Sequence, residues 1–181
     1  MAAAPSRRPD RDVADRGEFG RLLAENERYA GSFDRSVLTA APLRGLAVVA
    51  CMDARLDVEN ALGLRAGEAH IIRNAGGLAT EDVIRSLIVS QQLLGTGEIV
   101  VLGHTRCGLL NADEDELRGR LAAATGEALD VGFGSFDHLE HSVRASVDIL
   151  RTHPWLKRGP VHGLVFDVAT GRVSEVASTP G

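Results

Sequence analysis

Two short apolar runs, each ending abruptly in polar residues, constrain the fold of this chain most strongly. The run at 99–102 (IVVL) is followed by Gly-His-Thr-Arg-Cys-Gly at 103–108. The run at 46–50 (LAVVA) is followed by Cys-Met-Asp-Ala-Arg at 51–55. Short uninterrupted apolar runs are typical of strands buried on both faces of a parallel sheet. We therefore expect two buried strands that deliver polar side chains at their carboxyl ends.

The rest of the chain alternates strands with helices. Apolar runs predict strands at 46–50, 69–72, 98–102 and 163–167, and a last strand at 172–176 that pairs antiparallel. Periodic apolar residues and capping signals predict helices over 17–30, 57–62, 80–94, 113–124 and 136–151. Such an alternation predicts an α/β fold, with a mainly parallel central sheet flanked by helices and an antiparallel edge strand.

Polar residues at the helix starts carry further expectations. Thr80 is expected to cap the helix that follows it. The acidic run at 113–116 (DEDE) is expected to be a solvated helix start rather than a cation site, because acidic side chains favour helix N-termini. His138 and His141 lack the spacing of a zinc-protease helix and are expected on a solvated helix surface.

The length of 181 residues is that of one domain with a substantial core. Residues 1–16 are rich in Arg, Asp, Ala and Pro without periodicity, which predicts a disordered N-terminal tail. Residues 17–181 are expected to form a single domain that begins with a helical arm. That arm either lies across a neighbouring subunit or packs on its own domain, and the sequence leaves both open.

Charge and hydropathy exclude several classes of protein. The net charge of -5 gives no basic surface for nucleic acid. No apolar run approaches the roughly 20 residues that span a bilayer, and no apolar segment of a secretory signal follows the first residues. We therefore expect a cytoplasmic protein that binds neither membrane nor nucleic acid. In that compartment its two cysteines are poor candidates for a disulfide.

Three side chains at the ends of the predicted strands match the ligand preference of zinc. In open parallel sheets, ligands bind beyond the carboxyl ends of the strands, where the strand order reverses. Cys51, His104 and Cys107 all fall at such ends, and thiolate and imidazole groups are zinc ligands. Cys51 alone is more typical of a core residue, but the three together predict one zinc ion with an exchangeable fourth position.

Three segments resemble the signature segments of the β-class carbonic anhydrases: CMDAR at 51–55, IIRNAGG at 71–77 and GHTRCG at 103–108. The similarity extends from 43 to 110, and 163–176 resembles the closing strands of that family. The resemblance implies a β-carbonic anhydrase-like fold and a lyase that interconverts carbon dioxide and bicarbonate. It also implies a homodimer or larger homo-oligomer, with the active site near a subunit interface.

By this resemblance Cys51, His104 and Cys107 bind one zinc ion per chain, and Asp53 and Arg55 form the catalytic dyad. Zinc with three protein ligands keeps a position for water, so carbon dioxide hydration would proceed by attack of zinc-bound hydroxide. In the all-histidine carbonic anhydrases, the pKa of that water falls from about 15.7 to about 7. Two thiolates cancel the charge of the ion, so we expect a higher water pKa and an activity that rises towards alkaline pH.

Asp53 has two possible roles beside such an ion. It can accept a hydrogen bond from the hydroxide, or rotate and become the fourth zinc ligand. A bidentate pair with Arg55 would hold it away from the metal. We therefore expect a site that switches between an open state and an Asp53-closed state, with low pH favouring closure. A surface ion pair of little energetic value is the alternative for Asp53 and Arg55 considered alone.

The glycines at 76 and 77 allow two interpretations. Gly76 and Gly77 could offer backbone N–H groups to an anion such as bicarbonate, or they could relieve crowding where a strand meets a helix. Arg73 could pair with an acidic neighbour or help to hold a dimer. On the N-terminal arm, Tyr29 and Phe33 could reach the site of a neighbouring subunit.

Two other functions compete with carbon dioxide hydration. A related zinc hydrolase would attack carbon disulfide or carbonyl sulfide with the same ligands. A non-catalytic zinc-binding homologue would keep Asp53 permanently on the metal. The presence of Arg55 argues against the second alternative, because a purely structural site has no need of it.

Overall fold

A computed structural model describes residues 17–34 and 38–176 of the chain. Contacts divide the chain into two units, Met1–Leu38 and Thr39–Gly181. The tail predicted at 1–16 lies outside the described residues. In the first unit, helix α2 (Gly17–Ser32) agrees with the helix predicted there. Its apolar residues Phe19 and Leu22 are each 60% exposed.

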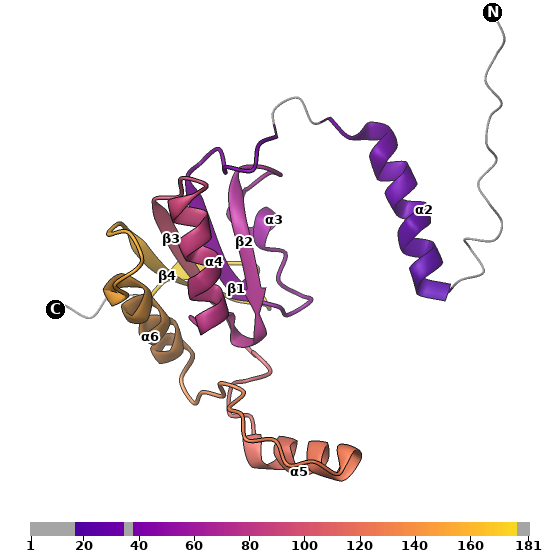
Figure 1. Ribbon diagram of the computed structural model, residues 1–181, viewed down its shortest axis with the longest axis vertical. Coiled ribbons are helices and arrows are strands. Elements are labelled where there is room, and N and C mark those ends of the chain that lie inside the picture. Colours follow the sequence, from indigo (N-terminus) through magenta and orange to yellow (C-terminus); the bar gives the residue numbers. More distant parts are fainter. Residues whose placement is uncertain (1–16, 35–37, 177–181) are drawn as a thin grey trace, which may run out of the picture. The chain divides into compact units, whose positions relative to one another are not determined.

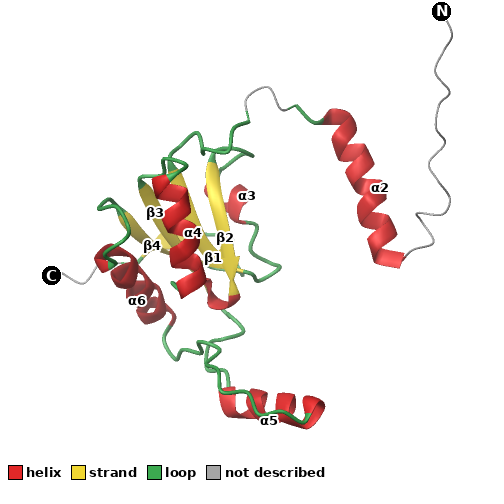
Figure 2. Cartoon of the chain, viewed as in Figure 1, coloured by secondary structure: helices red, strands yellow, loops and turns green. Residues whose placement is uncertain are grey.

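The second unit is built on one five-stranded sheet (Figures 1 and 2). Its strands are β1 (Leu46–Cys51), β2 (Ala69–Asn74), β3 (Glu98–His104), β4 (Val161–Phe166) and β5 (Val173–Glu175). Their order is β2-β1-β3-β4-β5, with parallel pairing from β2 to β4 and an antiparallel β5 at the edge. The fold class predicted from the sequence is thereby confirmed.

Helices cover both faces of this sheet (Figure 2). The helices of this unit are α3 (Val58–Leu62), α4 (Glu81–Gln92), α5 (Glu114–Thr125) and α6 (Leu139–Thr152), with a short 3-10 turn η1 (Ala75–Gly77). Buried residues of α4 and α6 pack on one face of β1, β3 and β4. On the other face lies a second cluster, which includes Val58 of α3 and both cysteines. No described helix is long and apolar enough to span a membrane.

The sheet order places a topological switch between β1 and β3. From β1 the chain moves to β2 on one side, and then returns past β1 to β3 on the other side. Such a reversal opens a crevice at the carboxyl ends of the two central strands. Cys51 is the last residue of β1 and His104 is the last residue of β3. The topology therefore brings two of the three predicted ligands to one place.

Some element boundaries differ from those predicted. Strand β3 runs on to His104 because its pairing with β4 continues to Phe166. Helix α6 begins at Leu139 rather than 136, because Phe136 instead pairs with Leu110 in an isolated parallel bridge. Thr80 holds the N-cap position of α4, but its hydroxyl makes no capping bond and accepts from Asn74 Nδ2. Each of these differences arises from a contact with a residue outside the sequence segment from which the element was predicted.

Helix α5 and the segment that returns from it form an excursion from the sheet, which we call the α5 hairpin (residues 113–136) (Figure 1). Asp113 caps α5 by accepting the N–H of Glu116. No residue of α5 is buried. The hairpin therefore depends on contacts other than a hydrophobic core of its own.

Candidate metal centre

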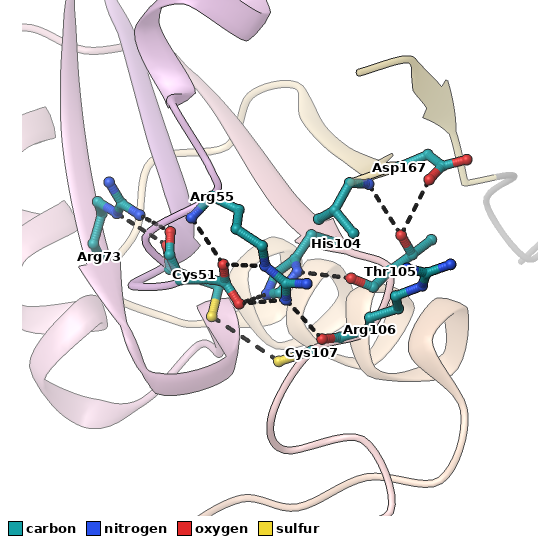
Figure 3. Close-up of polar contacts among 10 residues, drawn as sticks. Cys51, Arg55, Arg73, His104, Thr105, Arg106, Cys107 and Asp167 are labelled. Atoms are coloured by element: carbon teal, nitrogen blue, oxygen red, sulfur yellow. Dashed lines mark hydrogen bonds and ion pairs between the residues drawn. The ribbon is translucent and has the colours of Figure 1, made fainter. Parts of the chain in front are cut away.

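Three donor atoms converge at the carboxyl ends of β1 and β3 (Figure 3). Ligand atoms of Cys51, His104 and Cys107 all lie within 4.8 Å of one another, and all three residues are buried. The two sulfurs are 4.0 Å apart and both cysteines are free thiols. Among the described residues, this is the group that could hold a metal ion.

The geometry of these donors fits a tetrahedral metal. With Zn–S bonds of about 2.3 Å, two sulfurs on a tetrahedron lie about 3.8 Å apart, close to the observed 4.0 Å. His104 Nε2 is the one buried side-chain nitrogen or oxygen without a hydrogen-bond partner in the described part of the chain. An orphaned buried polar atom ordinarily costs about 1–3 kcal/mol, and a metal at this position would satisfy it.

The imidazole of His104 is held in the orientation that a metal ligand needs. Its Nδ1 lies 3.0 Å from the Thr105 carbonyl oxygen, which selects the tautomer with a proton on Nδ1 and a lone pair on Nε2. Thr105 is in turn fixed to the loop after β4: its hydroxyl donates to Asp167 Oδ1 and accepts the N–H of Val168. The residue after His104 is thus anchored to the loop that follows β4.

The two thiols have opposite pKa shifts. Burial raises the pKa of Cys51, but the His104 imidazole and the N–H groups of Asp53 and Gly76 outweigh burial and bring it to about 7. Burial and the neighbouring Cys51 sulfur raise the pKa of Cys107. Two thiolates repel each other in one buried site, and a bound cation allows both to ionise. The electrostatics therefore favour a divalent ion at this position.

Asp53 and Arg55 form a bidentate pair beside the donors. Arg55 Nε donates to Asp53 Oδ1 at 2.9 Å and Nη2 donates to Oδ2 at 2.7 Å. These bonds, with the N–H of Arg55, hold the pKa of Asp53 well below its usual range. Asp53 Oδ2 lies 3.8 Å from His104 Nε2, yet Asp53 is not a member of the converging donor group. The carboxylate is thus adjacent to the centre and turned towards the guanidinium.

Arg55 also joins the two segments that supply the donors. Its Nη2 donates to the Arg106 carbonyl oxygen at 2.9 Å. Arg106 has a φ of 56°, in the left-handed region that non-glycine residues seldom adopt, and it lies between His104 and Cys107. One guanidinium therefore bridges the turn after β1 and the turn after β3.

Arg73 has a positioning role that the sequence analysis did not assign. Its charge helps to lower the pKa of Asp57, whereas its hydrogen bonds within the described residues go to backbone carbonyl oxygens. Its Nε donates to the Cys51 carbonyl oxygen at 2.9 Å, and its Nη2 donates to the Asp53 carbonyl oxygen at 2.7 Å. The register of β2, which sets Arg73 opposite Ala50, was the available signal, but it required knowing which strands are neighbours.

Gly76 and Gly77 lie directly behind Cys51. Both have positive φ, 80° and 67°. A Cβ at Gly77 would lie 2.9 Å from the Cys51 backbone nitrogen and 3.0 Å from the Ala50 carbonyl carbon. The N–H of Gly76 interacts with the Cys51 sulfur. Close packing therefore explains why glycine is needed at 77, as one of the two interpretations of this turn required.

The remaining histidines of interest lie elsewhere. His138 at the N-cap of α6 and His141 in its first turn are both exposed, with ring centroids 5.1 Å apart. Neither belongs to the donor group at the strand ends. The predicted position on a solvated helix surface is confirmed for His141, whereas His138 lies just before the helix.

The fold and the donors together define an α/β protein with a buried Cys-His-Cys group at a topological switch, suited to one metal ion. Comparison with protein families gives the class a name: residues 46–173 match the family model described as carbonic anhydrase. The chain belongs to the β-class carbonic anhydrase family.

Individual relatives agree with this assignment. The chain is 45% identical over 155 residues to β-carbonic anhydrase 1 of Mycobacterium tuberculosis, covering 85% of this chain and 94% of the relative. A carbonic anhydrase crystal structure from Streptococcus mutans superposes with a TM-score of 0.83 at 42% identity, covering 88% of this chain and 97% of that one. A carbon disulfide hydrolase of Acidithiobacillus thiooxidans is 34% identical over 154 residues, covering 72% of this chain and 76% of that relative.

Proposed function

We propose that this protein is a cytoplasmic zinc-dependent carbonic anhydrase that interconverts carbon dioxide and bicarbonate. One observation carries the proposal: a buried three-donor group lies next to a carboxylate that an arginine turns away from it. Three protein donors and a free fourth position are typical of catalytic zinc sites, whereas four protein donors are typical of structural ones.

Cys51, His104 and Cys107 would hold the zinc ion. Zinc in such a site would lower the pKa of water and so supply a nucleophile, in larger amounts as the pH rises into the alkaline range. The chain contributes the ligand geometry. Thr105 orients the imidazole, and Arg73 fixes the backbone on either side of Met52.

Asp53 would accept a hydrogen bond from the nucleophile and aim it at the carbon of the substrate. It can do so because Arg55 keeps its pKa low, so that the carboxylate stays an acceptor throughout the working pH range. Arg55 is the positioning residue: its two bonds set the carboxylate plane and keep Asp53 from becoming a fourth ligand. The open state of the predicted switch agrees with this arrangement.

A role for Gly76 and Gly77 in binding bicarbonate stays a proposal. The backbone N–H groups of a tight turn can face one side and bind an anion, and this turn has positive φ at both glycines. The Cys51 sulfur would compete with the anion for the Gly76 N–H, with which it already interacts. A bicarbonate titration followed by the amide resonances of both glycines tests this role, and unchanged resonances would assign the turn to packing alone.

We also propose that the protein is a homodimer or a larger homo-oligomer. Helix α2 leaves Phe19, Leu22 and Tyr29 more than half exposed, and β2 is an edge strand of the sheet. Exposed apolar side chains and free sheet edges are features that association covers. Light scattering on the full chain tests the proposal, and a monomer at micromolar concentration would contradict it.

Carbon disulfide or carbonyl sulfide is the alternative substrate, supported by the identity to a carbon disulfide hydrolase. Assays of carbon dioxide hydration and carbon disulfide hydrolysis by the zinc-loaded protein decide between them, with Asp53→Ala as control. We expect carbon dioxide hydration that Asp53→Ala removes. Hydrolysis of carbon disulfide alone would favour the alternative, and zinc binding without either activity would indicate a non-catalytic homologue.

A further inference from the structure

One residue of the acidic run at the start of α5 is not solvated as expected. The side chain of Glu114 is only 18% exposed, whereas that of Asp115 is 94% exposed. Glu114 Oε1 accepts the N–H of Ser135 at 2.8 Å, and Oε2 pairs with Arg118 Nη2 at 2.8 Å. The N–H groups of Ser135 and Phe133 lower the pKa of Glu114 to about 2. Glu114 therefore ties α5 to the segment that returns from it.

The segment that Glu114 holds meets the turn behind the metal centre. A Cβ at Gly134 would lie 2.5 Å from Leu78 Cδ1, and the φ of Gly134 is +80°. The Leu78 side chain is also in contact with Gly76, where a Cβ would lie 3.0 Å from Leu78 Cγ. Gly134 thus abuts Leu78, and Leu78 abuts the glycine whose N–H faces the Cys51 sulfur.

A second leucine completes this apolar surface. Leu109 Cδ1 would lie 3.1 Å from a Cβ at Gly76, so Leu78 and Leu109 flank the same glycine. Leu109 packs against the buried cluster that contains both Cys51 and Cys107. Its carbonyl accepts the N–H of Phe136 at 3.1 Å, at the base of the α5 hairpin. Both leucines are half-buried, so each keeps some of its surface free.

We propose that Leu78 and Leu109 form the apolar wall that substrate meets beside the metal centre, and that Glu114 positions this wall by holding Gly134 against Leu78. The inference rests on the proposed function and deepens it. Carbon dioxide is apolar and linear, so it needs an apolar surface near the nucleophile. Since apolar pockets discriminate by size, the wall sets how readily the larger carbon disulfide enters.

Truncation variants and a matched pair on α5 test the proposal. Leu78→Ala and Leu109→Ala each shorten a side chain of the wall and so enlarge the space next to it. We expect the ratio of kcat/KM for carbon disulfide to that for carbon dioxide to rise about tenfold. Glu114→Ala should raise this ratio about threefold and raise KM for carbon dioxide with kcat unchanged. Glu116→Ala removes an exposed carboxylate from the same helical turn and should leave both constants as they are. Zinc content should stay the same in every variant.

Amide exchange reports directly on the hydrogen bond from the Ser135 N–H to Glu114 Oε1. Glu114→Ala should speed exchange of the Ser135 N–H, and combining it with Leu78→Ala should change the substrate ratio no further than Leu78→Ala alone, because both act through one contact. Faster Ser135 exchange with wild-type KM and ratio would overturn the proposal. Unchanged Ser135 exchange in Glu114→Ala would overturn it as well.

The wall is tested separately from the function. If the wild type hydrolyses only carbon disulfide, the proposed function fails. The wall is then tested by comparing KM for carbon disulfide between the same variants and the wild type. If it turns over neither compound, methyl resonances under dissolved carbon dioxide decide. Shifts at Leu78 and Leu109, but not at the control Leu93, would support the wall. Leu93 is the C-cap residue of α4 and is 77% exposed. Absence of shifts at the two leucines would overturn it.

Discussion

The donor end of the sheet and the α5 hairpin are neighbours in the fold, but they are held in different ways. At the donor end, Cys51, His104 and Cys107 are buried, and arginines bind the carbonyl oxygens of the surrounding turns. In the hairpin, α5 has no buried residue, and Glu114 and Arg118 make the main cross-connections. The first region is fixed by burial together with backbone hydrogen bonds, and the second by a few charged side chains.

This difference implies that the two regions respond differently to substitution. Changes at the donor end should alter metal binding or the chemical step, because burial and backbone bonds set the ligand geometry there. Changes in the hairpin should leave the metal in place and alter loop order or substrate discrimination. The four predictions below separate these outcomes.

The largest effect is expected at Asp53. Asp53→Asn keeps the shape of the side chain but removes its charge and one of its two acceptor oxygens. The bidentate pair with Arg55 is then lost, and the remaining carbonyl oxygen is a weaker acceptor. We expect kcat/KM for carbon dioxide to fall by about 10²–10⁴-fold with zinc still bound. Asp115→Asn, on the hairpin and 94% exposed, is the control. Wild-type activity in Asp53→Asn would remove Asp53 from the mechanism.

The next effect is expected in metal affinity. Arg73 binds the carbonyl oxygens of Cys51 and Asp53, so Arg73→Ala should loosen the segment that carries one ligand. Loss of such supporting contacts typically weakens metal affinity by about 10–100-fold. Competition with a zinc chelator measures the change, with Arg120→Ala on exposed α5 surface as control. Equal affinities in the two variants would contradict the positioning role of Arg73.

A pair of glycine substitutions compares the stability of the two regions. Gly77→Ala forces a side chain against the backbone of Cys51 at positive φ, and we expect a loss of about 1–3 kcal/mol in the free energy of unfolding. Gly119→Ala adds a Cβ within α5 with nothing within 4 Å, and should stabilise α5 by up to about 1 kcal/mol. Urea unfolding and α5 amide exchange measure these changes. A neutral Gly77→Ala would show that the turn has room to relax.

The smallest effect concerns pH and the hairpin. The pKa of Glu114 is depressed from 4.5 to about 2 in the folded chain. Its contribution to hairpin order is therefore present above the unfolded value and lost as the pH falls through the folded value. Protection of the Ser135 amide, corrected for intrinsic exchange, should hold down to about pH 4.5 and decline towards pH 2. In Glu114→Gln this decline should be absent, and a decline shared with that variant would assign it to another group.

The donor end was largely predictable from the sequence because its features are local. Apolar runs identified the strands, and each predicted ligand lies within five residues of the end of a run. The contacts of Arg73 and Glu114 were not predicted, because each joins groups far apart in the sequence. Arg73 and Asp53 are 20 residues apart, and Glu114 and Ser135 are 21 residues apart. Such contacts leave no periodic signal.

The same reasoning explains the errors of detail. The acidic run was treated as one solvated segment, which holds for Asp115 but not for Glu114. Thr80 was expected to cap α4 because it occupies the capping position, yet its hydroxyl accepts from Asn74. In both cases a partner brought near by the fold changed the role that local sequence suggested.

Elemental analysis of the full-length protein, purified without chelators and with its thiols kept reduced, tests the central claim most directly. We expect one zinc ion per chain, which is lost when Cys107→Ser removes one of the three donors. Absence of a stoichiometric transition metal in the wild-type protein would contradict it.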